Sequence, residues 1–101
     1  MNTMHAHHEW LPDTRIVVSR DQVSTTLSGE TIILQMRDGT YYGLDAVGTR
    51  IWSLINVPAT LAEIAATVER EYDVDGVRAM ADLTALAGEL LERGLIEIAT
   101  A

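Results

Sequence analysis

The hydrophobic pattern of this 101-residue chain changes its period once, at Asp45, and that change divides the expected fold into two parts. Before Asp45, β-branched and apolar residues alternate with polar ones, as in half-buried strands. After Asp45, apolar residues recur every three to four positions, as on one face of a helix. A chain of this length forms one domain with one core. The pattern predicts an α+β domain in which a three-stranded antiparallel sheet is followed by three helices.

The expected strands lie in residues 15–20, 22–27, 30–37 and 40–44. Ile32, Leu34 and Met36 share one face of the strongest of them by alternation. Asp38-Gly39 predicts a two-residue hairpin turn after it, because such turns need positive φ angles that Asp-Gly adopts at low cost. In the returning strand 40–44, Tyr42 and Leu44 share a face.

Capping residues mark the expected helices. Asp45 can cap a helix that reaches about Asn56, before Pro58, and Thr60 with Glu63 forms a capping box for a helix over 61–72. A long helix follows over 76–93, with Gly94 at the position of a left-handed C-terminal residue. Residues 95–99 can add a short strand. Residues 1–14 show no periodicity and are expected to form a flexible arm, with residues 15–101 as the folded domain.

Composition argues against an enzyme. The chain has no Cys and no Lys, so cysteine nucleophiles, thiolate metal sites and phosphate-binding lysines are excluded, and we expect no cofactor. The only cluster of metal-ligand types, His5, His7, His8 and Glu9, lies in the expected arm with no further His to complete it, so we expect no metal site. There is neither a signal peptide nor an apolar run of about 18 residues, which favours a cytoplasmic protein without membrane contact.

The helices at 61–72 and 76–93 resemble a helix-turn-helix, so a winged-helix DNA-binding regulator is an alternative. Its second helix would read DNA with its first turns, where Arg78 lies between Asp75 and Asp82. Seven arginines against fifteen acids give a net charge of −8, which repels a phosphate backbone. We therefore expect no nucleic-acid partner, whereas a basic or neutral peptide would be tolerated or attracted.

The strand 40–44 comes last in the sheet, and the chain then leaves directly into a helix. Such a strand can keep a free edge, to which an extended peptide adds by main-chain pairing. The alternative is that both tyrosines simply pack on the core. A free edge can also pair two copies of the chain, so a weak homodimer stays open.

Residues 38–55, DGTYYGLDAVGTRIWSLI, resemble the pattern G-x-Y-[YF]-x-L-[ND]-x-x-[GA]-x-x-[IV]-W-x-L-[IL] of the PqqD family. Thr60, Glu63-Ile64, residues 72–74 and Leu90-Leu91-x-x-Gly94-Leu95-Ile96 also match, so the resemblance spans about 22–96. It is strongest to the discrete recognition proteins of lasso-peptide biosynthesis. The peptide chaperone of pyrroloquinoline quinone synthesis, and other pathways to ribosomally made peptides, remain alternatives.

The resemblance implies a wing-like sheet and a peptide-binding function. In the family, the leader segment of a precursor peptide adds antiparallel beside the third strand, under the third helix, and a partner enzyme does the chemistry; in lasso pathways this partner is a leader-cleaving protease. Tyr42→Pro would then remove an amide that the added strand needs. The binding residues implied are Thr40, Tyr41, Tyr42, Gly43, Leu44, Val77, Arg78, Met80, Ala81, Asp82 and Thr84.

Overall fold

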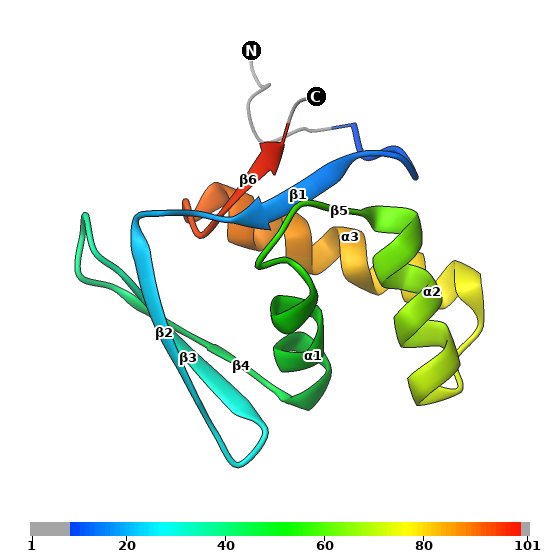
Figure 1. The fold of residues 1–101 in the computed structure, drawn as a ribbon, viewed down its shortest axis with the longest axis horizontal. Helices are drawn as coiled ribbons and strands as arrows, with labels where there is room; N and C mark the ends of the chain where they lie inside the picture. Colours follow the sequence, from blue (N-terminus) through cyan, green and yellow to red (C-terminus); the bar gives the residue numbers. More distant parts are fainter. Residues whose placement is uncertain (1–8, 100–101) are drawn as a thin grey trace.

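A computed structural model describes residues 9–99 of the chain as an α+β domain, which confirms the expected fold class (Figure 1). The strands are β1 (Arg15–Val18), β2 (Gln22–Leu27), β3 (Glu30–Gln35), β4 (Tyr41–Leu44), β5 (Ala59–Thr60) and β6 (Ile96–Ala99). The helices are α1 (Ala46–Leu54), α2 (Leu61–Tyr72) and α3 (Gly76–Glu92). The likeness to a winged helix stays a prediction.

The strands form two antiparallel sheets of three strands rather than one. β2, β3 and β4 are neighbours in one sheet, in chain order. In the other, β1 lies between β5 and β6, so segments from both ends of the domain pair with one another. Figure 1 shows the β2-β3-β4 sheet on one side of α1 and α2 on the other. The expected terminal strand at 95–99 is thus present as β6, whereas β5 was not predicted.

The hairpin turns differ from the expectation. β2 and β3 are joined by the two-residue turn Ser28-Gly29, in which both φ angles are positive (54° and 80°). At Asp38-Gly39 the loop is longer, because the Gln35 amide donates to the Thr40 carbonyl across four intervening residues. Gly39 still has a positive φ, of 74°, as predicted. The predicted two-residue length of the loop is wrong.

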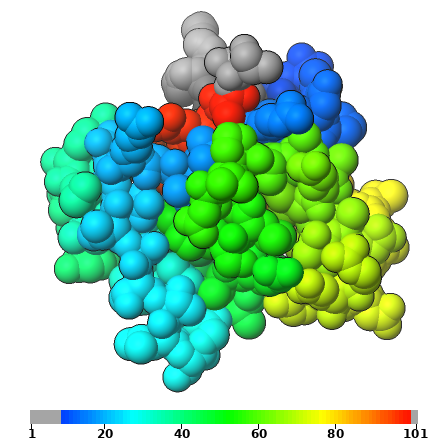
Figure 2. Space-filling model, viewed as in Figure 1, coloured from blue at the N-terminus to red at the C-terminus, as the bar shows by residue number. Residues whose placement is uncertain are grey.

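The faces of β3 explain how the sheet contacts the helices. Ile33 is fully buried, and Thr31 and Gln35 are buried on the same face. Ile32, Leu34 and Met36 do share a face, as the alternation predicts, but Ile32 and Met36 are exposed because this is the outer face of the sheet. α1 covers the inner face, and Figure 2 shows it filling the space between the sheet and α2. The core consists of Ile16, Ile33, Leu44, Ile51, Trp52, Ile55, Leu61, Ile64, Ala65, Val68, Ala79, Leu83, Ala87, Leu90, Leu95 and Ile96.

The capping residues behave as their types predict. The Asp45 carboxylate accepts from the Gly48 amide and begins α1 directly after β4. Thr60 and Glu63 form the predicted capping box of α2. The Thr60 amide, which donates to the Glu63 carboxylate, holds the pKa of Glu63 below its ordinary value. The buried Trp52 indole donates to the Ser24 hydroxyl and ties α1 to β2.

Part of the expected arm contacts the domain. The Thr14 carbonyl accepts from the Leu61 amide, and the Pro12 carbonyl accepts from the Ala62 amide, at 2.9 Å each. Trp10 packs against the core. Trp10, Pro12 and Thr14 thus contact the rest of the described structure, and the domain boundary at residue 15 stays a prediction. His5, His7 and His8 lie outside the described residues.

Candidate functional site

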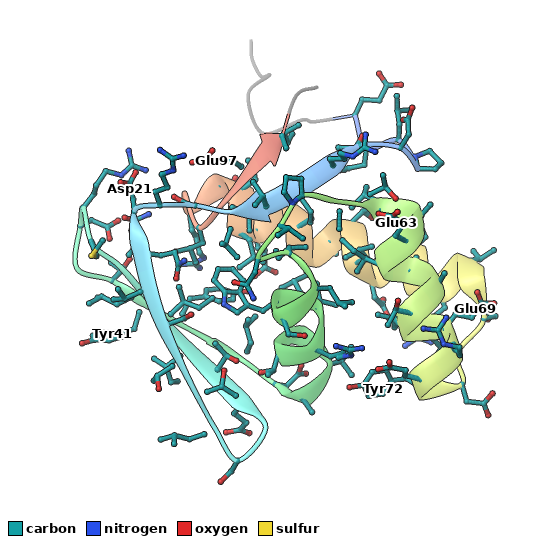
Figure 3. The ribbon with its side chains drawn as sticks, in the orientation of Figure 1. Asp21, Tyr41, Glu63, Glu69, Tyr72 and Glu97 are labelled. Carbon is teal, nitrogen blue, oxygen red and sulfur yellow. The ribbon has the colours of Figure 1, made fainter. Side chains whose placement is uncertain are left out.

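β4 lies at the edge of its sheet and borders the space next to α3. The sheet order is β2-β3-β4, so β4 has a strand neighbour on one side only. Its side chains divide between two faces: Leu44 is buried and Tyr42 half-buried on the inner face, whereas Tyr41 and Gly43 are exposed on the outer one. Figure 3 shows Tyr41 on the side of the sheet away from the helices.

The register shows which backbone groups of β4 face the open edge. In an antiparallel pair, hydrogen-bonded and non-hydrogen-bonded positions alternate. The Gln35 amide donates to the Thr40 carbonyl, so the bonded pairs are Gln35–Thr40, Ile33–Tyr42 and Thr31–Leu44. On the other side of β3, the bond from the Met36 amide to the Asp21 carbonyl gives the complementary alternation with β2. The amides and carbonyls of Tyr41 and Gly43 therefore point to the open edge.

This register corrects the proline test that the sequence suggested. The Tyr42 amide points inward to β3, so Tyr42→Pro would break a bond of the domain's own sheet. Tyr41 and Gly43 are the two positions whose amides an added strand would use.

A hollow of about 550 Å³ lies beneath β4, between that strand and α1, α2 and α3. Its apolar lining includes Ile51 of α1, Val68 of α2, and Ala79, Leu83 and Leu86 of α3. Asp45, Tyr72 and Asp82 add polar groups. Figure 3 shows Tyr72 at the end of α2, next to α1. A cavity of this size and lining suits apolar side chains of a ligand held at the β4 edge.

The structure brings together only some of the residues implied by the resemblance. Tyr42, Gly43, Leu44 and Asp82 line the hollow. Thr40 precedes β4, Tyr41 lies on the outer face of that strand, and Met80 packs against the core. Val77, Arg78, Ala81 and Thr84 are absent from the lining.

The α3 residues that line the hollow share only Asp82 with the binding residues implied by the resemblance. Ala79, Asp82, Leu83 and Leu86 follow the spacing of a single helical face, and all four line the hollow. The resemblance implied a groove lined by residues off the core stripe, such as Val77 and Ala81. In the structure, the residues of α3 that line the hollow extend its core stripe, which is the signal that could have found them. Which face of α3 a peptide contacts stays a prediction.

Tyr42 joins β4 to the second half of α3. Its hydroxyl donates to the Glu89 carboxylate, and the Arg93 guanidinium lies 4.9 Å from the centre of its ring. Burial, and then the hydrogen bond to Glu89, raise the pKa of the Tyr42 hydroxyl above its ordinary value. These contacts fix the distance between strand and helix at one end of the hollow.

Two arginines next to lining residues of the hollow form ion pairs. Arg78 pairs with Asp82 at 3.2 Å, where both side chains are exposed, and Arg50 contacts Glu71 through two hydrogen bonds of 2.9 Å. An exposed pair of this kind holds its partners weakly. In residues 9–99 no group of three or more His, Asp or Glu side chains is arranged to hold a metal ion. No helix within that range is long and apolar enough to cross a membrane.

Comparison with protein families decides what kind of domain this is. The model of the family described as coenzyme PQQ synthesis protein D matches residues 30–96, which contain β3, β4, all three helices and the first residue of β6. The chain belongs to the PqqD family. A search of curated protein sequences gives no match.

Two solved structures resemble this PqqD-family chain over most of its length. The first, described as TbiB1 in complex with the TbiA(beta) leader peptide, has a TM-score of 0.77 and 35% sequence identity. The similarity covers 84% of this chain and 99% of that one. The second, a lasso peptide synthetase B1 complexed with the leader peptide, has a TM-score of 0.73 and 22% identity, over 81% of this chain and 96% of that one. The second likeness shows a shared fold.

Proposed function

We propose that this chain binds the leader segment of a ribosomally made precursor peptide and presents it to a processing enzyme, without catalysing a reaction itself. The leader adds as a strand beside β4, pairing with the backbone of Tyr41 and Gly43. The observation that carries this proposal is the open edge of β4 next to an apolar hollow. An edge strand provides main-chain affinity, and a neighbouring pocket provides side-chain selection.

The solved relatives support a lasso-peptide pathway. TbiB1, 35% identical over nearly its whole length, is described in complex with a leader peptide. We propose accordingly that the partner enzyme is the leader-cleaving protease of such a pathway. A peptide chaperone of pyrroloquinoline quinone synthesis is the alternative that the family model itself favours. DNA binding finds no support, because a net charge of −8 repels a phosphate backbone.

The test is a titration of fluorescein-labelled peptides followed by fluorescence anisotropy. The probes are the TbiA(beta) leader peptide and the leader of the precursor encoded beside the gene of this chain. We expect a Kd of about 1 µM or lower for the neighbouring leader, or about −8 kcal/mol of binding free energy. A scrambled leader of the same composition is the control. Equal binding of scrambled and native leaders, or binding of neither, would contradict leader recognition.

A further inference from the structure

The outer face of the β2-β3-β4 sheet has a gap at the edge where the leader is proposed to add. The register places Thr25, Ile32 and Gly43 in one row across the three strands, and Val23, Leu34 and Tyr41 in the next. Gly43 ends its row without a side chain. We call the space above Gly43, bounded by Ile32 and Tyr41, the outer notch.

The fold does not require a glycine at this position. Gly43 is not among the residues with positive φ, so its backbone conformation is open to other residue types. A Cβ added there would meet Ile32 Cδ1 at 3.7 Å, which is an ordinary van der Waals contact. Glycine weakens a strand, and it often marks a place where a ligand or another backbone approaches closely. A role in ligand binding would therefore explain the glycine at position 43.

The walls of the outer notch are apolar and exposed to water. Ile32 is 47% exposed and Tyr41 is 69% exposed, although both lie on a sheet. Contact between such surfaces and another apolar group is favourable, and an aromatic side chain in a neighbouring strand can cover an edge glycine.

The same register defines where an added strand would direct its side chains. A leader residue opposite Gly43 forms a hydrogen-bonded pair with it, and its side chain points to the outer face. The residues next to it in the leader point to the inner face, toward the hollow beneath Leu44 and Tyr42. One short stretch of leader thus contacts both faces of the sheet.

We propose that the leader residue paired with Gly43 carries a large apolar side chain, aromatic or β-branched, that fills the outer notch and packs on Ile32 and Tyr41. This inference rests on the proposed strand addition and makes Gly43 a specificity-determining residue. The leader is then read at consecutive positions, one side chain in the hollow and the next in the outer notch.

The test combines an alanine scan of the TbiA(beta) leader peptide with two variants of this chain. Gly43→Val fills the outer notch with a good strand former, and Thr25→Val is the matched control in the same row, away from the β4 edge. We expect one apolar leader residue whose replacement by alanine weakens binding to the wild-type chain about tenfold. That penalty should fall below about threefold in Gly43→Val and persist in Thr25→Val, as for two groups that share one space.

A reversed preference, in which Gly43→Val binds the alanine peptide more tightly than the native one, supports the same conclusion because valine then competes with the leader side chain. If Gly43→Val leaves every alanine penalty unchanged while Tyr41→Pro still weakens binding, the outer notch plays no part and strand addition stands. If neither variant affects binding, both the inference and the proposed site are contradicted.

Discussion

Tyr41→Pro is expected to weaken leader binding about 30-fold while the domain remains folded. Proline removes the Tyr41 amide that faces the open edge, and its ring occupies space needed by the added strand. One lost hydrogen bond accounts for about 1 kcal/mol, and the steric effect brings the total to about 2 kcal/mol. Edge strands tolerate proline where the amide faces solvent, so the sheet itself loses no bond. Anisotropy titration gives the Kd, and circular dichroism melting reports the folding.

Thr26→Pro is the matched control for this change. By the alternation between β2 and β3, the Thr26 amide points to the opposite open edge of the same sheet. The control is expected to change the Kd less than twofold, although it loses the hydroxyl contact of Thr26 with Thr31. Equal weakening by both prolines would mean that general damage to the sheet, rather than the β4 edge, controls binding.

Strand pairing can also be tested with modified leader peptides, without any change to the domain. N-methylation of each leader amide in turn should give a pattern of period two, because only alternate amides of an added strand point to β4. A flat pattern would argue against strand pairing even if Tyr41→Pro failed to fold.

Asp82→Trp is expected to weaken leader binding by about 10- to 150-fold, because the indole would cover the hollow from α3. The Asp82 side chain is 69% exposed and lines the hollow, so the replacement costs the fold little beyond an exposed ion pair with Arg78. A leader side chain excluded from an apolar pocket loses about 1.5–3 kcal/mol of burial. The Kd is measured by the same titration.

Ala81→Trp adds the same side chain one residue earlier, where the position is exposed and outside the lining of the hollow. It should change binding less than about twofold. The pair of variants therefore distinguishes the face of α3 that lines the hollow from the face of Ala81, which the resemblance also implied. The reverse result, with Ala81→Trp blocking binding and Asp82→Trp neutral, would return the site to the other face of α3.

Local sequence signals predict the helices and strands of this fold better than they predict which of these elements contact one another. The capping residues Asp45 and Thr60 begin α1 and α2 where predicted, because a cap satisfies backbone amides within four residues of itself. The hairpin loops were predicted less well. The two-residue turn is at Ser28-Gly29, between β2 and β3, whereas the loop that contains Asp38-Gly39, between β3 and β4, is longer than expected. Both dipeptides favour turns, but the length of each loop depends on the register in which the two flanking strands pair.

The features of the fold that could not be predicted from the sequence depend on pairing between distant segments of the chain. The second sheet depends on β1 meeting β6 across most of the chain, and on β5, which has two residues and no periodicity to detect. Likewise, the hollow combines Val68 of α2 with Ile51 of α1, and each of these had only a core signal. The strand pattern predicted β4 and the resemblance implied that a peptide adds beside it, but the backbone register was needed to separate Tyr41 and Gly43 from Tyr42.

Amide hydrogen exchange, resolved by residue with NMR and recorded with and without the leader, tests the central claim most directly. Strand addition beside β4 predicts slower exchange at the amides of Tyr41 and Gly43 once the leader is bound, because both gain a hydrogen-bond acceptor. The amides of Ser24 and Thr26 on the opposite edge should exchange at unchanged rates. Protection at the β2 edge or along β6, with Tyr41 and Gly43 unaffected, would contradict the account.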